Sequence, residues 1–191
     1  MRKLAMQTGG RYTYADYLKW TDGERWELID SIAYNMTPAP SRRHQEILGE
    51  LYRQLSNYLV GKDCKVYPAP FDVRLPQEAE NEEGTTTVVQ PDIVVVCDPV
   101  KLDNRGCKGA PDLVVEILSP ETAKKDLTTK LTLYERVGVK EYWIVHPTDK
   151  TVMIFELSQD GKYGRPQTYG EGDQIPVRTL IDLTIDLVSV F

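Results

Sequence analysis

The sequence predicts a mixed α/β (α+β) domain over residues 1–191, with the element order helix, strand, strand, strand, helix, strand. Three observations support this fold class. After the N-cap Ser41, apolar residues recur at three- and four-residue steps as far as Gly61, which is typical of an amphipathic helix. The later runs 92–96 and 112–118 are almost wholly apolar, as strands buried on both faces of a sheet are. The chain is long enough for one sizeable core but short for two, so we expect a single domain.

The segment before the long helix is expected to add a short helix and a β-hairpin. Thr13–Asp16 has the form of a capping box, which begins a helix. The stretches 26–29 and 32–36 flank Asp30-Ser31, a two-residue connection typical of a hairpin, although glycine is the more usual second residue. We therefore expect an N-terminal hairpin before the core.

Polar and turn residues divide the rest of the chain into further elements. In 71–75, alternate residues are apolar and are expected to face the core. A second helix is expected from its cap Asp126 to Gly138. The other predicted elements, in chain order, are a strand at 65–67, a solvated acidic loop at 78–84, strands at 142–145 and 152–155, and a β-rich C-terminal extension at 175–191.

Composition limits how the chain can bind a polyanion. Asp and Glu number 29 against 23 Lys and Arg, which gives a net charge of -6. This balance argues against a general electrostatic grip on nucleic acid, so a local basic patch or a metal would have to hold such a partner. No segment approaches membrane-spanning length, and residues 1–6 lack the apolar run of a signal peptide. We therefore expect a cytoplasmic protein with no membrane partner.

The cysteines and histidines are too few and too scattered for a structural zinc site. Cys64, Cys97 and Cys107 form no Cys-x-x-Cys pair, and only His44 and His146 are available to join them. We expect no structural zinc, and we expect reduced, mostly buried thiols.

Glu116 is the most informative residue, because a carboxylate within the apolar run 112–118 is costly to bury without a partner. Side chains alternate along a strand, so Glu116 shares a face with Leu118 and leaves the core only through that face. Asp92 opens the other apolar strand, and the two carboxylates would converge at one end of the sheet if the strands are neighbours. Two such anions require a cation between them, and a hard divalent ion, Mg²⁺ or Mn²⁺, suits oxygen ligands.

Lys130, at the margin of the buried face of the second helix, is the candidate for further charge compensation. Its neighbours Lys124 and Lys125 are expected to be exposed to solvent. Simpler interpretations stay open. Lys130 can extend past the core to water, Glu116 can form a structural salt bridge, and Asp92 can be a polar residue that opens a strand.

These residues belong to a recognisable pattern. Its parts are Gln90-Pro91-Asp92 with the apolar run after it, Ala110-Pro111-Asp112 through Glu116-Ile117-Leu118-Ser119-Pro120, Lys130 with Tyr134, and Gly138-Val139-Lys140-Glu141-Tyr142-Trp143. The pattern resembles the Uma-two family of restriction-endonuclease-like proteins, within the PD-(D/E)xK nuclease superfamily. The resemblance covers the chain from about Tyr12 to Phe155, and its motifs are specific in combination.

The resemblance implies a restriction-endonuclease-like core and a metal-dependent phosphodiesterase site. In such a site Asp92 and Glu116 would ligate the metal, together with the backbone carbonyl of Ile117. The metal would polarise the scissile phosphate and acidify an attacking water. Lys130 would orient that water or stabilise developing charge.

Two further residues match family positions and would complete the cleft. Glu27 lies on the early hairpin, where it can equally be a surface charge, and His44 lies on the long helix, where it can equally be a satisfied core residue. The chain departs from the pattern at two positions. Leu118 stands where the superfamily has its usual lysine, so catalysis depends on Lys130 reaching back from the helix. Ser31 stands where the family has glycine, which implies a distorted hairpin.

The sequence thus predicts a metal-dependent DNA endonuclease, or a protein derived from one. Two alternatives stay open. A non-catalytic interaction module that keeps the fold is favoured by the acidic net charge and by Leu118. A hydrolase of another phosphorylated substrate could use the same carboxylates. Strands rich in Val and Ile, with the β-rich C-terminal extension, are compatible with a homodimer.

Overall fold

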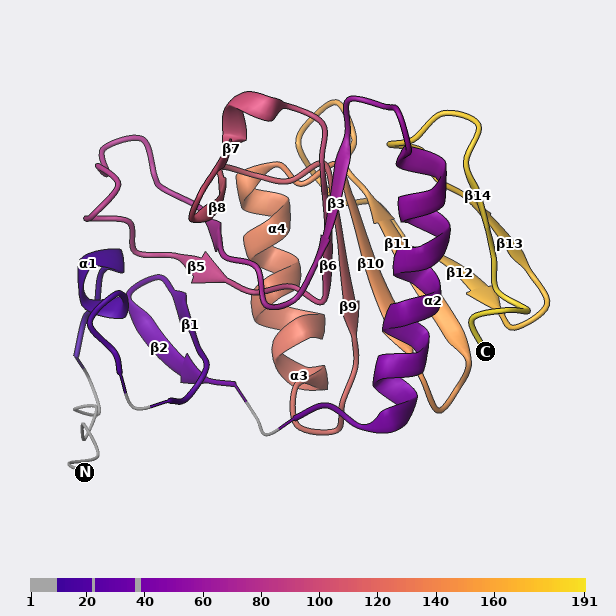
Figure 1. The fold of residues 1–191 in the computed structure, drawn as a ribbon, viewed down its shortest axis with the longest axis horizontal. Coiled ribbons are helices and arrows are strands. Elements are labelled where there is room, and N and C mark those ends of the chain that lie inside the picture. The colour runs from indigo at the N-terminus through magenta and orange to yellow at the C-terminus, as the bar shows by residue number, and fades with distance from the viewer. Residues whose placement is uncertain (1–9, 22, 37–38) are drawn as a thin grey trace.

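A six-stranded mixed sheet forms the centre of the computed structural model, which describes residues 10–21, 23–36 and 39–191 (Figure 1). The signal-peptide expectation for residues 1–6 falls outside these ranges. The strands of this central sheet are β3 (Lys65–Pro68), β6 (Ile93–Val96), β9 (Leu113–Ile117), β10 (Glu141–His146), β11 (Thr151–Glu156) and β12 (Gln167–Gly170). They lie in the order β12, β11, β10, β9, β6, β3, and only β9 and β10 are parallel neighbours. Every residue of β6 and β9 is buried, which confirms the prediction from their apolar runs.

A second six-stranded sheet contains the predicted N-terminal hairpin. Its strands are β1 (Trp26–Ile29), β2 (Ile32–Asn35), β4 (Val73–Arg74), β5 (Val88–Val89), β7 (Leu102–Asp103) and β8 (Gly106–Lys108), in the order β2, β1, β5, β4, β8, β7. The hairpin turn places Asp30 at φ 49° and Ser31 at φ 70°, the left-handed region that a primed two-residue turn requires. The register from Ile29 opposite Ile32 to Trp26 opposite Asn35 is unbroken. The hairpin is therefore regular, and the implied distortion at Ser31 is confined to the dihedral angles of the turn.

The helical elements are α1 (Tyr14–Tyr17), α2 (Arg42–Leu59), a 3₁₀ turn (Pro99–Lys101), α3 (Ala123–Lys125), a π-helical turn (Asp126–Lys130) and α4 (Leu131–Val137). Of these, α2 covers one face of the central sheet and α4 covers the other, whereas α1 packs against β1 and β5 of the second sheet. Ser41 caps α2 as predicted, since its side chain accepts a hydrogen bond from His44 N. Gly138 ends α4 in the left-handed conformation, also as predicted. The second helix, however, begins at Ala123, so Asp126 does not cap it and instead lies buried within it.

Two separate cores explain this layering. The apolar stripe of α2 (Ile47, Leu51, Leu55) packs on one face of the central sheet, together with the C-terminal hairpin of β13 (Gln174–Pro176) and β14 (Thr184–Asp186). Residues of α4 and of the second sheet pack on the other face. The connection from β9 to the parallel strand β10 must cross over the sheet, and it does so through α3 and α4. This crossover brings the helix that carries Lys130 onto the face from which Glu116 projects.

The thiol prediction is wrong for two of the three cysteines. Cys64 and Cys97 form a disulfide, whereas Cys107 is a free, buried thiol. Cys64 precedes β3 and Cys97 follows β6, and these antiparallel strands pair Lys65 with Val96. Pairing of the two cysteines follows from that strand register, which the spacing of cysteines along the sequence does not reveal.

The second sheet buries a charge that the alternation in 71–75 did not predict. Arg74 is fully buried beside Val73, and its guanidinium donates hydrogen bonds to Glu82 and Asp103. The acidic loop is thus partly ordered against the sheet rather than simply solvated. Among the described residues, no helix is both long enough and apolar enough to cross a membrane.

Candidate active site

Asp92 and Glu116 lie on neighbouring strands at the same end of the central sheet. β6 and β9 are antiparallel, with Ile93 opposite Val115, so Asp92 and Glu116 occupy the next pair of positions. Glu116 shares its face with Val114 and Leu118, which belong to the core beneath α4, as the alternation predicted. The sheet therefore brings the two carboxylates to one place, as expected if their strands are neighbours.

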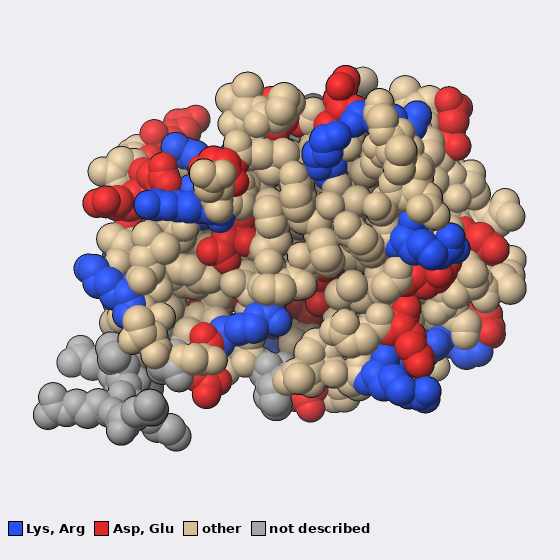
Figure 2. All heavy atoms as spheres, in the orientation of Figure 1, with Lys and Arg blue, Asp and Glu red and all other residues tan. Residues whose placement is uncertain are grey.

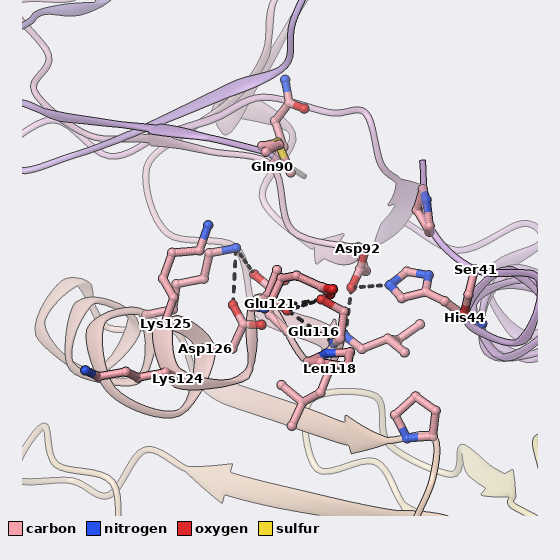
Figure 3. A pocket seen from close by; sticks show the side chains of 18 of the residues that line it. Ser41, His44, Gln90, Asp92, Glu116, Leu118, Glu121, Lys124, Lys125 and Asp126 are labelled. Atoms are coloured by element: carbon pink, nitrogen blue, oxygen red, sulfur yellow. Dashed lines mark hydrogen bonds and ion pairs between the residues drawn. The ribbon is translucent and has the colours of Figure 1, made fainter. Parts of the chain in front are cut away.

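Asp92 is oriented by two hydrogen-bond donors. Its Oδ2 atom accepts from the backbone N of Ile117 at 2.7 Å and lies 3.2 Å from Nε2 of His44 (Figure 3). Backbone N–H and C=O groups of one residue point to the same edge of a strand, so the Ile117 carbonyl also lies on the Asp92 side of β9. His44 reaches the site from α2, on the opposite face of the sheet from α4. The end of β6 is thus tied to both α2 and β9.

Glu116 is buried and receives two hydrogen bonds on one oxygen. Its Oε1 atom accepts from Lys130 Nζ at 2.8 Å and from Tyr134 OH at 2.9 Å. Leu118 supplies no cation. The ammonium of Lys130, which reaches back from the helix, takes the place of the lysine that the superfamily usually has at the position of Leu118. The ammonium of Lys130 is buried, so its side chain does not extend to water.

Glu27 is the second anchor of Lys130. Its Oε1 atom lies 2.8 Å from Lys130 Nζ, and its Oε2 atom lies 2.6 Å from Lys125 Nζ. Gln90 N also donates to Glu27 Oε1, at 3.1 Å. Glu27 is therefore fully buried and not a surface charge of the hairpin. The expected solvent exposure of Lys125 is wrong as well, because the hairpin folds over this end of the helix and pairs with it.

Asp126 adds a third acid beside Lys130. Its Oδ1 atom is 3.7 Å from Lys130 Nζ and has no hydrogen-bond partner among the described residues, although it is buried. The π-helical turn places Asp126 and Lys130 at its two ends. Short π-helical turns within α-helices occur frequently at functional sites.

The surroundings shift the pKa values of the three acids Glu116, Asp126 and Glu27 in different directions. Burial raises the pKa of Glu116 well above its usual range, and Lys130 offsets only part of this effect because Asp126, Asp92 and Glu27 oppose it. Burial also raises the pKa of Asp126. Burial acts in the same direction on Glu27, but the ammonium groups of Lys130 and Lys125 outweigh it and lower its pKa to about 2. Burial would lower the pKa of Lys130, yet the surrounding carboxylates raise it well above its usual value. The ammonium groups of Lys130 and Lys125 thus favour the ionised form of Glu27, whereas burial favours the protonated form of Glu116.

Most of these groups line one cavity. It has a volume of about 1000 Å³, and Asp92, Glu116, Ile117, Lys130 and His44 all line it. Glu27 lies behind the lining, in contact with Lys130. The cationic residues around the cavity are Arg25, Arg43, Lys124, Lys125 and Lys130. The acidic residues around the cavity are Asp92, Glu116, Glu121 and Asp126. The structure therefore brings the predicted site residues together in a cavity lined by residues of both charges.

Comparison with known proteins identifies the family. The family model described as "Uma2: Putative restriction endonuclease" matches residues 14–188. The chain belongs to this family. A relative from Synechocystis sp., an uncharacterized protein, is 25% identical over 177 residues, which cover 91% of this chain and 88% of the relative.

A solved structure shares the fold of this Uma2-family chain. It is described as a putative nuclease belonging to DUF820 from Anabaena variabilis, and it matches with a TM-score of 0.73 at 18% identity, covering 94% of this chain and 97% of that one. The predicted fold class is confirmed. Since restriction-endonuclease-like folds carry many activities, the site must supply the functional argument.

The donor groups of this Uma2-family site fit a hard divalent cation. Carboxylate and carbonyl oxygens are the ligands that Mg²⁺ and Mn²⁺ prefer. Among the described residues, no three His, Cys, Asp or Glu side chains are grouped closely enough to hold an ion by themselves. Mg²⁺ is commonly held by one or two carboxylates, with water and substrate phosphate completing its shell. A pair of carboxylates with the Ile117 carbonyl matches that mode of binding.

Sequence reasoning missed three participants. The sequence places Lys125 at the surface and Asp126 at a helix cap, and it names Tyr134 only as part of the family pattern. A signal was available for Asp126, because it stands four residues before Lys130 and such residues are neighbours on a helix. The pairing of Lys125 with Glu27 joins residues 98 apart and had no local signal.

Proposed function

We propose that this Uma2-family chain is a metal-dependent endonuclease that hydrolyses phosphodiester bonds in DNA. One observation carries the proposal: carboxylates from two adjacent strand ends and a buried lysine line the same cavity. Structural ion pairs rarely need a cavity, whereas a hydrolytic site needs one to admit its substrate. The family membership supports nuclease chemistry over other reactions of the same carboxylates.

The roles follow from chemistry and position. Asp92, Glu116 and the Ile117 carbonyl would hold Mg²⁺ or Mn²⁺, which when bound supplies Lewis-acid polarisation of a phosphate. Lys130 would stabilise the negative charge that develops on the phosphate, because its ammonium is held 2.8 Å from Glu116 at the cavity wall. Glu27 and Lys125 would keep that ammonium in place, and His44 would keep Asp92 oriented through their 3.2 Å contact.

Cleavage of defined DNA tests the proposal. The purified chain is incubated with supercoiled plasmid, a labelled duplex and a labelled single strand, each with Mg²⁺, Mn²⁺ or EDTA. We expect metal-dependent cleavage, and we expect Glu116→Gln and Asp92→Asn each to lower its rate by about 10²-fold or more. Glu171→Gln is the matched control, because Glu171 is an exposed acid paired with Lys150 outside the cavity.

The outcomes separate the candidates. Cleavage that survives Glu116→Gln contradicts the assignment of the site. Metal binding without affinity for nucleic acid in any form would instead support the non-catalytic module. The homodimer, the cytoplasmic location and the single domain stay predictions of the sequence. Sedimentation of the purified chain measures the first of them.

A further inference from the structure

Arg25 differs from most arginines of this chain in having no acidic partner among the described residues. Seven arginines lie within ion-pair distance of a carboxylate: Arg42, Arg43, Arg53, Arg74, Arg105, Arg136 and Arg178. Arg25 is held by a neutral amide instead, since its Nε and Nη2 atoms donate to Gln90 Oε1 at 3.0 and 2.8 Å. No carboxylate in the described part of the chain therefore compensates its positive charge.

The amide that holds Arg25 is itself fixed in orientation. Gln90 Nε2 donates to Asp72 Oδ1 at 2.8 Å and to Tyr17 OH at 3.0 Å. Tyr17 OH in turn donates to the same oxygen of Asp72, at 2.9 Å. The nitrogen of the amide must face this pair, so its oxygen must face the guanidinium. The hydrogen-bond chain thus places Arg25 without neutralising it.

Arg25 and Gln90 both line the cavity of the candidate site. Gln90 stands two residues before Asp92, and Figure 3 shows it above the cluster that contains Asp92 and Glu116, with its amide directed away from that cluster. The backbone of Gln90 also donates to Glu27, the anchor of Lys130. Arg25 itself is exposed, directly before β1. A cation held by these bonds lines the same cavity as the candidate metal site and is open to a ligand.

The other cations of the cavity are engaged or less constrained. Lys125 and Lys130 are paired with Glu27 and Glu116, and Arg43 donates to the backbone of Phe191 and lies 3.8 Å from Glu46. Lys124 is exposed, and no described neighbour fixes its ammonium. Figure 2 shows acidic and basic side chains intermixed over one face of the molecule, so no broad basic surface replaces these local contacts there.

We infer that Arg25 binds a backbone phosphate of the nucleic-acid strand, next to the phosphate that is cleaved. This inference rests on the proposed function. Guanidinium groups bind phosphate oxygens through two parallel N–H bonds, and Arg25 uses only Nε and one Nη2 hydrogen on Gln90. No residue in the described part of the chain accepts a hydrogen bond from its other N–H groups. Arg25 is thus a substrate-binding residue that sets where the strand lies relative to Asp92 and Glu116.

Equilibrium binding without divalent ions tests the inference, because no cleavage then intervenes. Fluorescence anisotropy of a labelled duplex and a labelled single strand is measured in EDTA over a salt series for the wild type, Arg25→Ala, Arg25→Lys and Gln90→Ala. We expect Arg25→Ala to weaken binding about tenfold. We also expect it to reduce the slope of log affinity against log salt by about one, the signature of one lost phosphate contact. Arg25→Lys keeps the charge, so it should keep the slope while binding less tightly than the wild type.

Gln90→Ala frees the guanidinium but leaves its charge. It should weaken binding less than Arg25→Ala, and the double variant should bind no more weakly than Arg25→Ala alone. The control is Arg178→Ala, since Arg178 pairs with Glu156 and does not line the cavity. Thermal melting of each variant accounts for any loss of folded protein.

The results distinguish this inference from the proposed function. If the wild type binds and cleaves DNA while Arg25→Ala binds with unchanged affinity and salt slope, the role of Arg25 is overturned and the nuclease stands. If Arg178→Ala weakens binding as much as Arg25→Ala, specific binding at Arg25 is also overturned. If the wild type binds no DNA in any form, both the role of Arg25 and the DNA substrate are overturned.

Discussion

Among the described residues, two Lys or Arg side chains are buried, Arg74 in the second sheet and Lys130 beside the central sheet, and their surroundings differ. Arg74 is 1% exposed, but its partners Glu82 and Asp103 are 37% and 44% exposed. Lys130 is 3% exposed, and its partners Glu27, Glu116 and Asp126 are between 0% and 5% exposed. Arg74 does not line the main cavity, whereas Lys130 does.

The difference separates a buried cation whose acids reach water from one that is enclosed with its acids beside a cavity. Acids that reach water can keep their charge whether or not Arg74 is present. The acids around Lys130 do not reach water, and burial raises the pKa of one of them, Glu116. The buried carboxylates beside the cavity outnumber the cations that compensate them. This imbalance of charge is the physical reason to expect a metal there.

The largest expected effect on stability comes from replacing each of the two buried cations, Lys130 and Arg74, in turn. We expect Lys130→Met to lower the free energy of unfolding by about 3–5 kcal/mol, because it leaves Glu27 and Glu116 buried without their shared ammonium. Arg74→Met should cost less, about 1–3 kcal/mol, because Glu82 and Asp103 can be hydrated. Urea unfolding measures both. Equal losses for the two variants would mean that exposure of the partners does not decide the cost.

Metal affinity should depend on the residue that orients Asp92. We expect His44→Gln to weaken Mn²⁺ binding about tenfold, because the ring nitrogen 3.2 Å from Asp92 Oδ2 is lost. Isothermal titration calorimetry measures this change. His146→Gln serves as control, since His146 faces Asp149 at 3.9 Å. An unchanged affinity in His44→Gln would assign His44 to packing alone.

Stability against pH tests the proton on Glu116. A carboxyl whose folded pKa is raised stabilises the fold fully below its usual value of 4.5, and this contribution is lost as the pH rises through the folded pKa. Glu116→Gln resembles the protonated form at every pH. We therefore expect it to melt about 2–4 °C above the metal-free wild type near neutral pH, with the difference vanishing towards pH 4.

Glu27, in the same cluster, gives a dependence of stability on pH that has the opposite sign. Its folded pKa of about 2 means that its stabilising contribution is present above the usual value of 4.5 and is lost as the pH falls towards 2. Thermal melts of wild type and Glu116→Gln in EDTA from pH 3 to pH 8 separate the two groups. A difference between the curves that does not change with pH would contradict the protonation of Glu116.

The smallest effect is expected at the turn of the hairpin that carries Glu27. Ser31 has φ 70°, which glycine adopts without a steric penalty. We expect Ser31→Gly to raise the free energy of unfolding by about 0.5–1 kcal/mol. Ser31→Ala is the matched control and should not stabilise. Chemical denaturation measures both, and a destabilising glycine would show that the turn is not strained.

The sequence predicted those features that local chemistry determines. Glu116 was identifiable because an acid in an apolar strand requires compensation, and the helix that carries Lys130 was identifiable from its stripe and its terminal Gly138. The boundaries of β6 and β9 followed from their apolar runs. In each case a few consecutive residues contain the whole signal.

Features that depend on distant pairing were not predictable in this way. The disulfide of Cys64 and Cys97 depends on the register of β3 with β6. The pairing of Lys125 depends on the hairpin folding over the start of the helix, which brings Glu27 to it across 98 residues. The burial of Arg74 depends on one acid from the acidic loop and one from β7. No single stretch of sequence contains these geometries.

The π-helical turn Asp126–Lys130 gives the helix an irregular winding between Lys125 and Lys130. In a regular α-helix, residues five positions apart lie about 140° apart around the axis and do not face the same side. The wider π-helical turn brings Lys125 and Lys130 to the same side, where both ammonium groups contact Glu27. The extra residue that this turn accommodates therefore lets two lysines of one helix share a single buried acid.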